Sequence, residues 1–245
     1  DLFRDKTHVQ LAENIPELVN SLPSQKILWL MVSNTAVDSI LDELLELLKP
    51  GDIIIDGGNS NYLESKKRYT QSNLKGIHFI DCGVSGGPEG ALNGACLMIG
   101  GSKNIVDDLD SLWREVSNGI SYKYLGESGA GHYAKMIHNG IEYGMMQSIA
   151  EGFNILKNSE YKFKLEEVAD IYNQRSVIES RLIAWTKKAF LDYGSDLNEY
   201  SGIIGHTGEG KWTLEESTRL GLQSRVIEES YNFRLKSEDN PTYIG

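Results

Sequence analysis

The chain contains few cysteines and prolines and no long apolar run. Two cysteines and five prolines are spread over 245 residues, and no apolar stretch approaches the ~20 residues that a membrane-spanning helix requires. An integral membrane protein is therefore not expected. The sequence has no N-glycosylation sequon and no signal-peptide pattern, which favours the cytoplasm.

Neither cysteine has a partner at the spacing of a disulfide framework or a metal site. Cys82 and Cys96 lie in apolar stretches, so we expect both thiols to be reduced and buried in the core. The histidines also lack the spacing of metal ligands. No metal is expected.

Basic residues are outnumbered by acidic ones. The 24 lysines and arginines stand against 35 aspartates and glutamates, which gives a net charge of -11. This charge repels nucleic acids and anionic lipids, so neither is expected as a partner. An anionic small molecule would need cations gathered at its site, and Arg234 and Lys236 are candidates.

Apolar residues make up 40% of the chain, enough for a sizeable core, and up to about residue 127 they follow two alternating patterns. Short β-branched runs predict strands, and helical spacing predicts the helices between them. We expect strands at residues 26–32, 52–58, 77–87, 95–101 and 120–126, with helices at 35–49, 60–75 and 104–116. This α/β order predicts a Rossmann-like, doubly wound, mostly parallel sheet with helices on both faces.

After residue 129 the strand pattern ends and helical patterns follow. They cover residues 131–157, 164–178, 180–192, 211–221 and 224–236. We therefore expect a partial dinucleotide-binding domain at 1–128 and an all-helical substrate and dimerisation domain at 129–245. The small turn residues at 127–129 mark the boundary.

The expected sheet lacks the unit with which dinucleotide-binding domains begin. Such domains open with a strand and G-x-G-x-x-G, and no such unit precedes the strand at 26–32. We expect either that this unit is absent from the chain or that the sheet begins differently. GAGHYA (129–134) is a formal match, but its helix carries so many reactive side chains that a tight junction is favoured over a pyrophosphate site.

The most informative feature is a polar stripe on the first long helix. Lys135, His138, Asn139, Glu142 and Tyr143 fall on one face of a 3.6-residue helix. A solvated polar face is the alternative to an active site. Because glycine-rich loops flank this helix and few of the five residues are typical of exposed faces, we favour the active site. A lysine and a glutamate two turns apart can divide the work of base and acid.

Two glycine-rich turns follow expected strands, DGGNSNY (56–62) and GVSGGPEGA (83–91). Ligands of open α/β sheets bind outside the carboxyl ends of the strands, where glycines let backbone N–H groups reach ligand oxygens. Plain tight turns are the alternative for each turn alone. Two such turns before a reactive helix favour a binding site.

Four motifs occur in the order found in one family. DGGNS (56–60), GVSGGPEGA (83–91), GAGHYAKMIHNGIEYG (129–144) and GEGKWT (208–213) resemble decarboxylating 6-phosphogluconate dehydrogenase, over about residues 9–240. Related β-hydroxyacid dehydrogenases share the SGG turn and the helix lysine but lack HNGIEYG and DGGNS. The chain resembles the short form of the family, with the N-terminal βαβ unit and the C-terminal tail absent.

The resemblance implies oxidative decarboxylation of 6-phosphogluconate to ribulose 5-phosphate and CO2 in the pentose phosphate pathway. It implies Lys135 as the base that takes the C3 hydroxyl proton and Glu142 as the acid that protonates C1. The implied substrate ligands are Asn59, Ser85, Gly86, Gly87, His138, Asn139, Tyr143 and Arg234, the last two for the phosphate.

The resemblance further implies NAD or NADP as cofactor, held by Met31, Val32, Asn59 and Val84. The residue that selects between the two cofactors belongs to the absent first unit, so both stay open. Thr207 and Glu209 stand where the long form carries a lysine and a threonine as phosphate ligands.

Two other functions stay open, a further β-hydroxyacid dehydrogenase of the 3-hydroxyisobutyrate type and a non-catalytic remnant. The resemblance also implies a homodimer or homotetramer. Apolar helix faces would supply the contact, with Leu156, Val168, Ile171, Leu182 and Ile183 as candidates.

Overall fold

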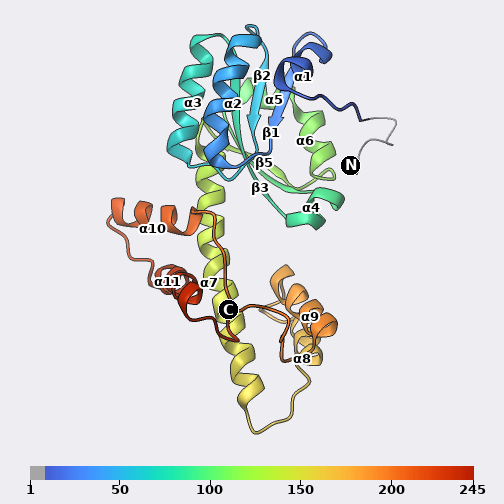
Figure 1. The fold of residues 1–245 in the computed structure, drawn as a ribbon, viewed down its shortest axis with the longest axis vertical. Helices are drawn as coiled ribbons and strands as arrows, with labels where there is room; N and C mark the ends of the chain where they lie inside the picture. The colour runs from blue at the N-terminus through green and yellow to red at the C-terminus, as the bar shows by residue number, and fades with distance from the viewer. Residues whose placement is uncertain (1–8) are drawn as a thin grey trace. The chain divides into compact units, whose positions relative to one another are not determined.

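The computed structural model describes residues 9–245, which divide into two compact units at Met136/Ile137 (Figure 1). The first eight residues of the expected first domain lie outside the described range. Each unit has its own core.

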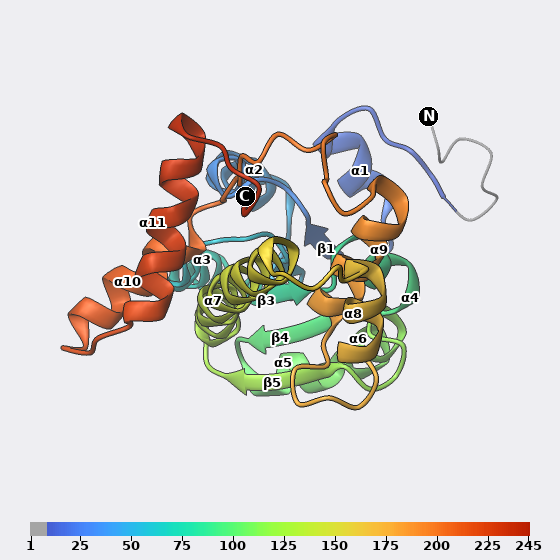
Figure 2. The ribbon, with the colours of Figure 1, turned by 90° about the horizontal axis from the view of Figure 1, so that it is seen from below.

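The first unit contains a five-stranded sheet in the order β1-β2-β3-β4-β5. Strands β1, β2 and β3 are parallel, β4 runs antiparallel to β3, and β5 is parallel to β4 (Figure 2). The expected mostly parallel sheet is confirmed. The reversal follows from the short link between β3 and β4, because a parallel return needs a crossover of a dozen or more residues. The strands are Ile27–Leu30, Ile53–Asp56, His78–Ser85, Cys96–Gly100 and Tyr122–Gly126.

Helices cover both faces of this sheet, as expected for a doubly wound fold. On one face, strand residues such as Ile54 and Phe79 pack with Val19 of α1 and Leu41 of α2. On the other face, the neighbouring strand positions pack with α5 and α6, because side chains alternate along a strand. The helices are α1 (Ile15–Ser21), α2 (Asn34–Leu47), α3 (Tyr62–Leu74), α4 (Gly87–Asn93), α5 (Lys103–Asp108) and α6 (Asp110–Val116).

The two cysteines have different environments. Cys82 in β3 is fully buried, as expected. Cys96 is exposed, so the expectation that it fills the core is wrong. It alternates with Leu97, which points into the core, and therefore faces the opposite side of β4.

Five helices make up the C-terminal part of the chain and confirm the expected helical pattern. The first, α7 (Ala130–Asn158), has 29 residues, and the division between the units falls within it. The others are α8 (Leu165–Tyr172), α9 (Arg181–Tyr193), α10 (Glu209–Arg219) and α11 (Arg225–Asp239).

The core of the second unit gathers where α7, α8 and α9 meet. It contains Phe153, Leu165, Ala169, Ile183 and Phe190, with Leu156 and Val168 packed against it. Three of the five candidates for a subunit contact, Leu156, Val168 and Ile183, thus pack in this core. Ile171 is exposed. Within residues 9–245, no helix has both the length and the apolar composition needed to cross a membrane.

Candidate active site

The carboxyl ends of β1, β2 and β3 meet at one edge of the sheet. Leu30 pairs with Asp56, and Asp56 pairs with Asp81, so β1 and β2 end level with each other, and β3 continues beyond them to Ser85. Met31 and Val32 follow β1, with Met31 largely exposed. A Cβ on Gly58 would lie 2.7 Å from the carbonyl oxygen of Val32, so the loops after β1 and β2 are in contact.

A buried polar network fixes the turn after β2. The carboxylate of Asp56 accepts hydrogen bonds from the backbone N–H of Gly58 at 3.2 Å, the hydroxyl of Ser60 at 2.8 Å and Arg68 at 3.1 Å. Arg68 also pairs with Asp38 at 2.7 Å. A buried charge must be paired in this way to be tolerated. The exposed side chain of Asn59 is therefore carried on a rigid turn.

Glycines shape the turn after β3. Val84 and Ser85 end the strand, and both are half-buried. Gly86 and Gly87 have φ angles of 130° and 60°, which residues with a Cβ atom rarely adopt. The chain thus turns directly from β3 into α4 and leaves the backbone of Gly86 and Gly87 at the edge of the sheet.

Lys135 lies on α7 against β3. Its side chain is 7% exposed, and a Cβ on Gly83 would come within 2.4 Å of the Cβ of Lys135. Gly131 of α7 lies equally close to β4, because a Cβ added to it would be 2.4 Å from the carbonyl oxygen of Met98. The absence of side chains at Gly83 and Gly131 thus lets α7 pack closely against the sheet and holds Lys135 beside β3.

A carboxylate caps the start of α7. Asp81, which is fully buried, accepts the N–H groups of Gly129 at 2.7 Å and His132 at 3.0 Å. The helix N-terminus is an anion site, and here the protein's own side chain fills it. This occupancy argues against the alternative in which GAGHYA binds a pyrophosphate and favours the tight junction.

Three residues of the polar stripe interact within the second unit. Asn139 is 8% exposed, and its Oδ1 lies 3.0 Å from Nδ1 of His138. The same nitrogen lies 3.6 Å from Oε2 of Glu142, one turn further along the helix. An amide, an imidazole and a carboxylate thus form one connected group on α7.

A buried glutamate from α10 joins this group. Glu209 is 2% exposed, accepts a hydrogen bond from Nδ2 of Asn139 at 3.0 Å and another from the Thr207 hydroxyl at 2.7 Å. In the sequence, Glu209 stands out only as a departure from a phosphate-binding loop. The signal that could have identified it is a carboxylate in a loop expected to bind an anion.

Tyr143 and Arg234 form a second pair in this unit. The Arg234 guanidinium carbon stands 3.6 Å from the centroid of the Tyr143 ring, and Arg234 donates to the Gly205 carbonyl at 2.8 Å and to the sulfur of Met146 at 3.5 Å. Burial raises the pKa of Tyr143, and burial lowers that of Arg234. A guanidinium has five N–H donors, so this buried cation has donors beyond these two contacts.

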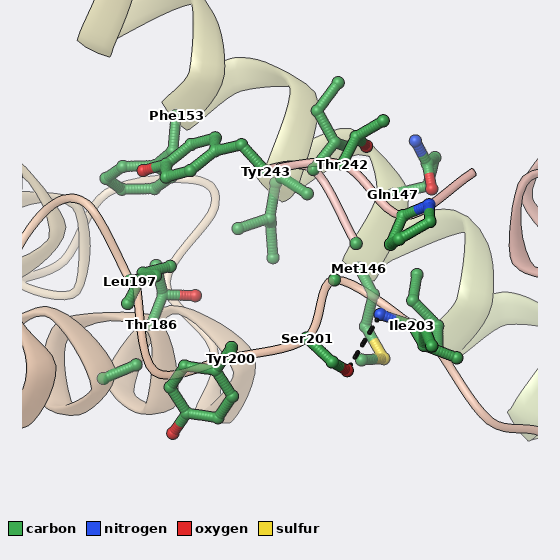
Figure 3. A pocket seen from close by; sticks show the side chains of 18 of the residues that line it. Met146, Gln147, Phe153, Thr186, Leu197, Tyr200, Ser201, Ile203, Thr242 and Tyr243 are labelled. Carbon is green, nitrogen blue, oxygen red and sulfur yellow. Dashed lines mark hydrogen bonds between the residues drawn. The ribbon is translucent and has the colours of Figure 1, made fainter. Parts of the chain in front are cut away.

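Tyr143 and Arg234 line a cavity of about 860 Å³ in the second unit. Figure 3 shows other side chains around it, among them Met146, Phe153 and Tyr243. Its walls come from α7, α9, residues 196–204 and residues 241–245. Phe153, Tyr200 and Tyr243 line the apolar part of the cavity. The wall of the cavity thus presents the guanidinium group of Arg234 among aromatic side chains.

Two family profiles match nearly the whole chain. The NAD binding domain of 6-phosphogluconate dehydrogenase matches residues 2–126, and the C-terminal domain of the same enzyme matches residues 131–242. The chain belongs to the 6-phosphogluconate dehydrogenase family. The family resemblance read from the four motifs is confirmed.

Relatives in this family resemble the chain over most of its length. It is 44% identical over 232 residues to YqeC of Bacillus subtilis (strain 168), provisionally named a 6-phosphogluconate dehydrogenase, covering 95% of this chain and 78% of that protein. It is 38% identical to the NAD(+)-dependent decarboxylating enzyme of Haloferax volcanii, covering 92% of this chain and 75% of that protein. The chain spans about half the length of the relatives from Buchnera aphidicola and Candida albicans.

A solved structure of the family matches the fold. The Plasmodium falciparum 6-phosphogluconate dehydrogenase, studied with its cofactor NADP+ and its substrate 6-phosphogluconate, superposes with a TM-score of 0.80 at 32% identity. The match covers 91% of this chain and 50% of that one. A 3-hydroxyisobutyrate dehydrogenase from Salmonella typhimurium shares the fold with a TM-score of 0.71 at 15% identity.

Proposed function

We propose that this protein, with NAD or NADP as hydride acceptor, oxidises 6-phosphogluconate and decarboxylates it to ribulose 5-phosphate and CO2. Family membership and the polar stripe on α7 support this proposal. The stripe carries a buried lysine and, two turns later, a half-buried glutamate. The reaction needs a base and an acid, because one proton leaves a hydroxyl and another is added to carbon.

Lys135 is the proposed base. Its neutral amine takes the proton of the C3 hydroxyl as the hydride leaves C3. The resulting β-keto acid loses CO2, and the Lys135 ammonium returns its proton to the carbonyl oxygen. Close packing against Gly83 restricts the side chain, which favours a fixed position for both proton transfers.

Glu142 is the proposed acid for the last step. Loss of CO2 leaves an enediol. Glu142 protonates its C1 while the neutral amine of Lys135 takes back the proton of the adjacent hydroxyl, which gives ribulose 5-phosphate. Its position 3.6 Å from Nδ1 of His138 places a polar neighbour beside the carboxyl group. Lys135 and Glu142 are both residues of α7.

We propose that the remaining stripe and turn residues hold the sugar acid. Asn59, Ser85 and the backbone at 86–87 would orient the carboxylate and hydroxyl groups, together with His138 and Asn139. Arg234 and Tyr143 would bind the phosphate, since guanidinium and phosphate form charge-assisted, often bidentate hydrogen bonds. A local cation is needed because the net charge of -11 repels an anionic substrate.

The residues at the edge of the sheet fit a nicotinamide cofactor. The loops after β1 and β2 touch each other, and they present an exposed thioether at Met31 and an exposed amide at Asn59. With Val32 and Val84, these residues would hold the nicotinamide end. The cofactor, when bound, supplies the hydride acceptor. Both NAD and NADP remain candidates.

We propose that the protein is located in the cytoplasm. We also propose that the boundary between its functional domains lies at residue 128. The proposed assembly is a homodimer or homotetramer. The second unit has an apolar groove of about 750 Å³ along α7. Exposed apolar side chains of Ile141, Met145 and Val226 line it. Exposed apolar surface of this kind is typical of protein interfaces.

One assay tests the proposed reaction. The full chain is incubated with 6-phosphogluconate and with 3-hydroxyisobutyrate, each with NAD and NADP, and both NAD(P)H absorbance and CO2 release are followed. We expect NAD(P)H and CO2 in equal amounts from 6-phosphogluconate. NAD(P)H without CO2, formed from 3-hydroxyisobutyrate alone, would favour the other dehydrogenase, and no reaction would favour the non-catalytic remnant.

A further inference from the structure

Glu209, Asn139 and His138 form a chain of hydrogen bonds across two helices of the second unit. Glu209 is the first residue of α10, and the other two are neighbours on α7. Glu209 and Asn139 are both buried, at 2% and 8% exposure. In a buried network each donor must meet an acceptor, so the position of every proton is constrained.

The chemistry of the groups fixes which atom donates and which accepts in each of these hydrogen bonds. A carboxylate only accepts, so Nδ2 of Asn139 donates to Oε1 of Glu209 at 3.0 Å. The Thr207 hydroxyl donates to the other oxygen at 2.7 Å. The amide of Asn139 is thereby oriented with its oxygen toward His138, where Oδ1 lies 3.0 Å from Nδ1. Because an amide oxygen also only accepts, Nδ1 must carry the proton.

Glu142 supports the same assignment from the other side. Its Oε2 lies 3.6 Å from Nδ1 of His138. When Glu142 is ionised this oxygen is an acceptor, like the amide oxygen of Asn139. A proton on Nε2 would then leave the lone pair of Nδ1 directed at both of them.

We propose that Glu209 is a positioning residue that, through Asn139, holds neutral His138 in the tautomer protonated at Nδ1. His138 then meets the sugar acid with Nε2 as an acceptor, which suits a substrate hydroxyl rather than a carboxylate. The consequence for binding rests on the proposed function, in which His138 and Asn139 hold the sugar acid. The tautomer itself does not.

The tautomer can be measured directly in the full chain without substrate. Long-range proton–nitrogen correlation spectra of protein labelled with 15N-histidine distinguish the two ring nitrogens, at about pH 8.5, where an ordinary histidine is neutral. His138→Gln assigns the signal by its disappearance. We expect a protonated Nδ1 in the unaltered protein. A protonated Nε2 would overturn the proposal whatever any variant shows.

Three variants test the role of Glu209. Glu209→Met removes the acceptor at similar length, and we expect the Nε2-protonated form to appear and kcat/KM for 6-phosphogluconate to fall about tenfold or more, as when a supporting partner is lost. Glu209→Gln keeps an acceptor for Asn139 and should retain the Nδ1 proton and most of the activity. Glu215→Met changes an exposed carboxylate on the same helix and should alter neither.

Retention of the Nδ1 proton in Glu209→Met, with unchanged kcat/KM, would overturn the proposal. Circular dichroism and thermal unfolding show whether Glu209→Met is folded. If it is not, the proton–nitrogen correlation spectrum of the unaltered protein tests the tautomer assignment. A protein that does not oxidise 6-phosphogluconate but carries the proton on Nδ1 would refute the proposed function and leave the tautomer assignment standing.

Discussion

The guanidinium group of Arg234 stacks on the ring of Tyr143, with its carbon 3.6 Å from the ring centroid. The two residues are 91 positions apart in the sequence and come from α11 and α7. Gly210 makes room for the contact, because its Cβ would lie 2.5 Å from the tyrosine ring. The stacking fixes the plane of the cation, which matters for binding a phosphate with two parallel hydrogen bonds.

Arg234→Lys should weaken binding of phosphorylated substrate. Lysine keeps the charge but loses the planar fork and the stacking on Tyr143, so we expect the KM for 6-phosphogluconate to rise about 10- to 100-fold. Steady-state kinetics with 6-phosphogluconate and with unphosphorylated gluconate separate the causes. An equal loss with gluconate would show that Arg234 does not act on the phosphate. The exposed Arg225 on the same helix provides the control, Arg225→Lys.

Lys135→Met should abolish turnover and keep the fold. The reaction loses its base, which we expect to lower kcat by about 10²- to 10⁴-fold. NAD(P)H formation measures the rate, and circular dichroism checks the fold. Lys123→Met removes an exposed lysine from the same unit and should have no effect. A near-normal rate in Lys135→Met would refute the assignment of the base.

Glu142→Gln should impair the protonation of C1. In D2O, the product of the unaltered enzyme should carry deuterium in one stereochemical position at C1, because the acid delivers it to one face of the enediol. The variant should react more slowly and lose this selectivity, as seen by proton NMR of the product. Glu151→Gln on the same helix is the control, since Glu151 is exposed. Unchanged rate and stereochemistry in Glu142→Gln would assign the acid elsewhere.

Gly83→Ala should destabilise the first unit. The added Cβ would lie 2.4 Å from the Cβ of Lys135 and 3.0 Å from the carbonyl oxygen of Gly131, so helix and strand must separate, at a cost of about 1–3 kcal/mol. Urea unfolding measures the change. Gly152→Ala in α7 meets no atom within 4 Å and should stabilise the helix by up to about 1 kcal/mol. Equal stability of Gly83→Ala and the parent would contradict the close packing.

The two thiols should react differently. Cys96 is exposed and Cys82 is buried. Burial raises the pKa of Cys82 far above its usual value, and the charge of Asp81 raises it further, so its reactive thiolate stays scarce even as the pH rises to 9. Titration with a thiol reagent at pH 8 should label one cysteine in the folded protein and both in urea. Labelling of Cys82 in the folded protein would contradict its burial.

The local structure could be predicted from the sequence, because hydrophobic periodicity is a local property. The strand at Ile53–Asp56 and the helix at Ala130–Asn158 lie within about two residues of the expected ranges. The direction of β4 depended on the length of a link rather than on its own pattern. The exposure of Cys96 depended on its place as the first residue of β4, on the opposite side from Leu97.

Contacts between distant residues could not be predicted in the same way. The hydrogen bond between Asn139 and Glu209 joins residues 70 positions apart, and that between Asp81 and Gly129 joins residues 48 apart. No spacing along the chain indicates such pairs. The roles of Lys135 and Glu142 were suggested by one helix face and remain predictions until the variants are measured.

The cap formed by Asp81 has a consequence for redesign. Its two oxygens accept from the main-chain amides of Gly129 and His132, which any residue at those positions except proline would offer. The hydrogen bonds that attach α7 to β3 therefore do not depend on which side chains follow along the helix. A designer could exchange the reactive groups further along this helix for others and still keep its attachment to the third strand.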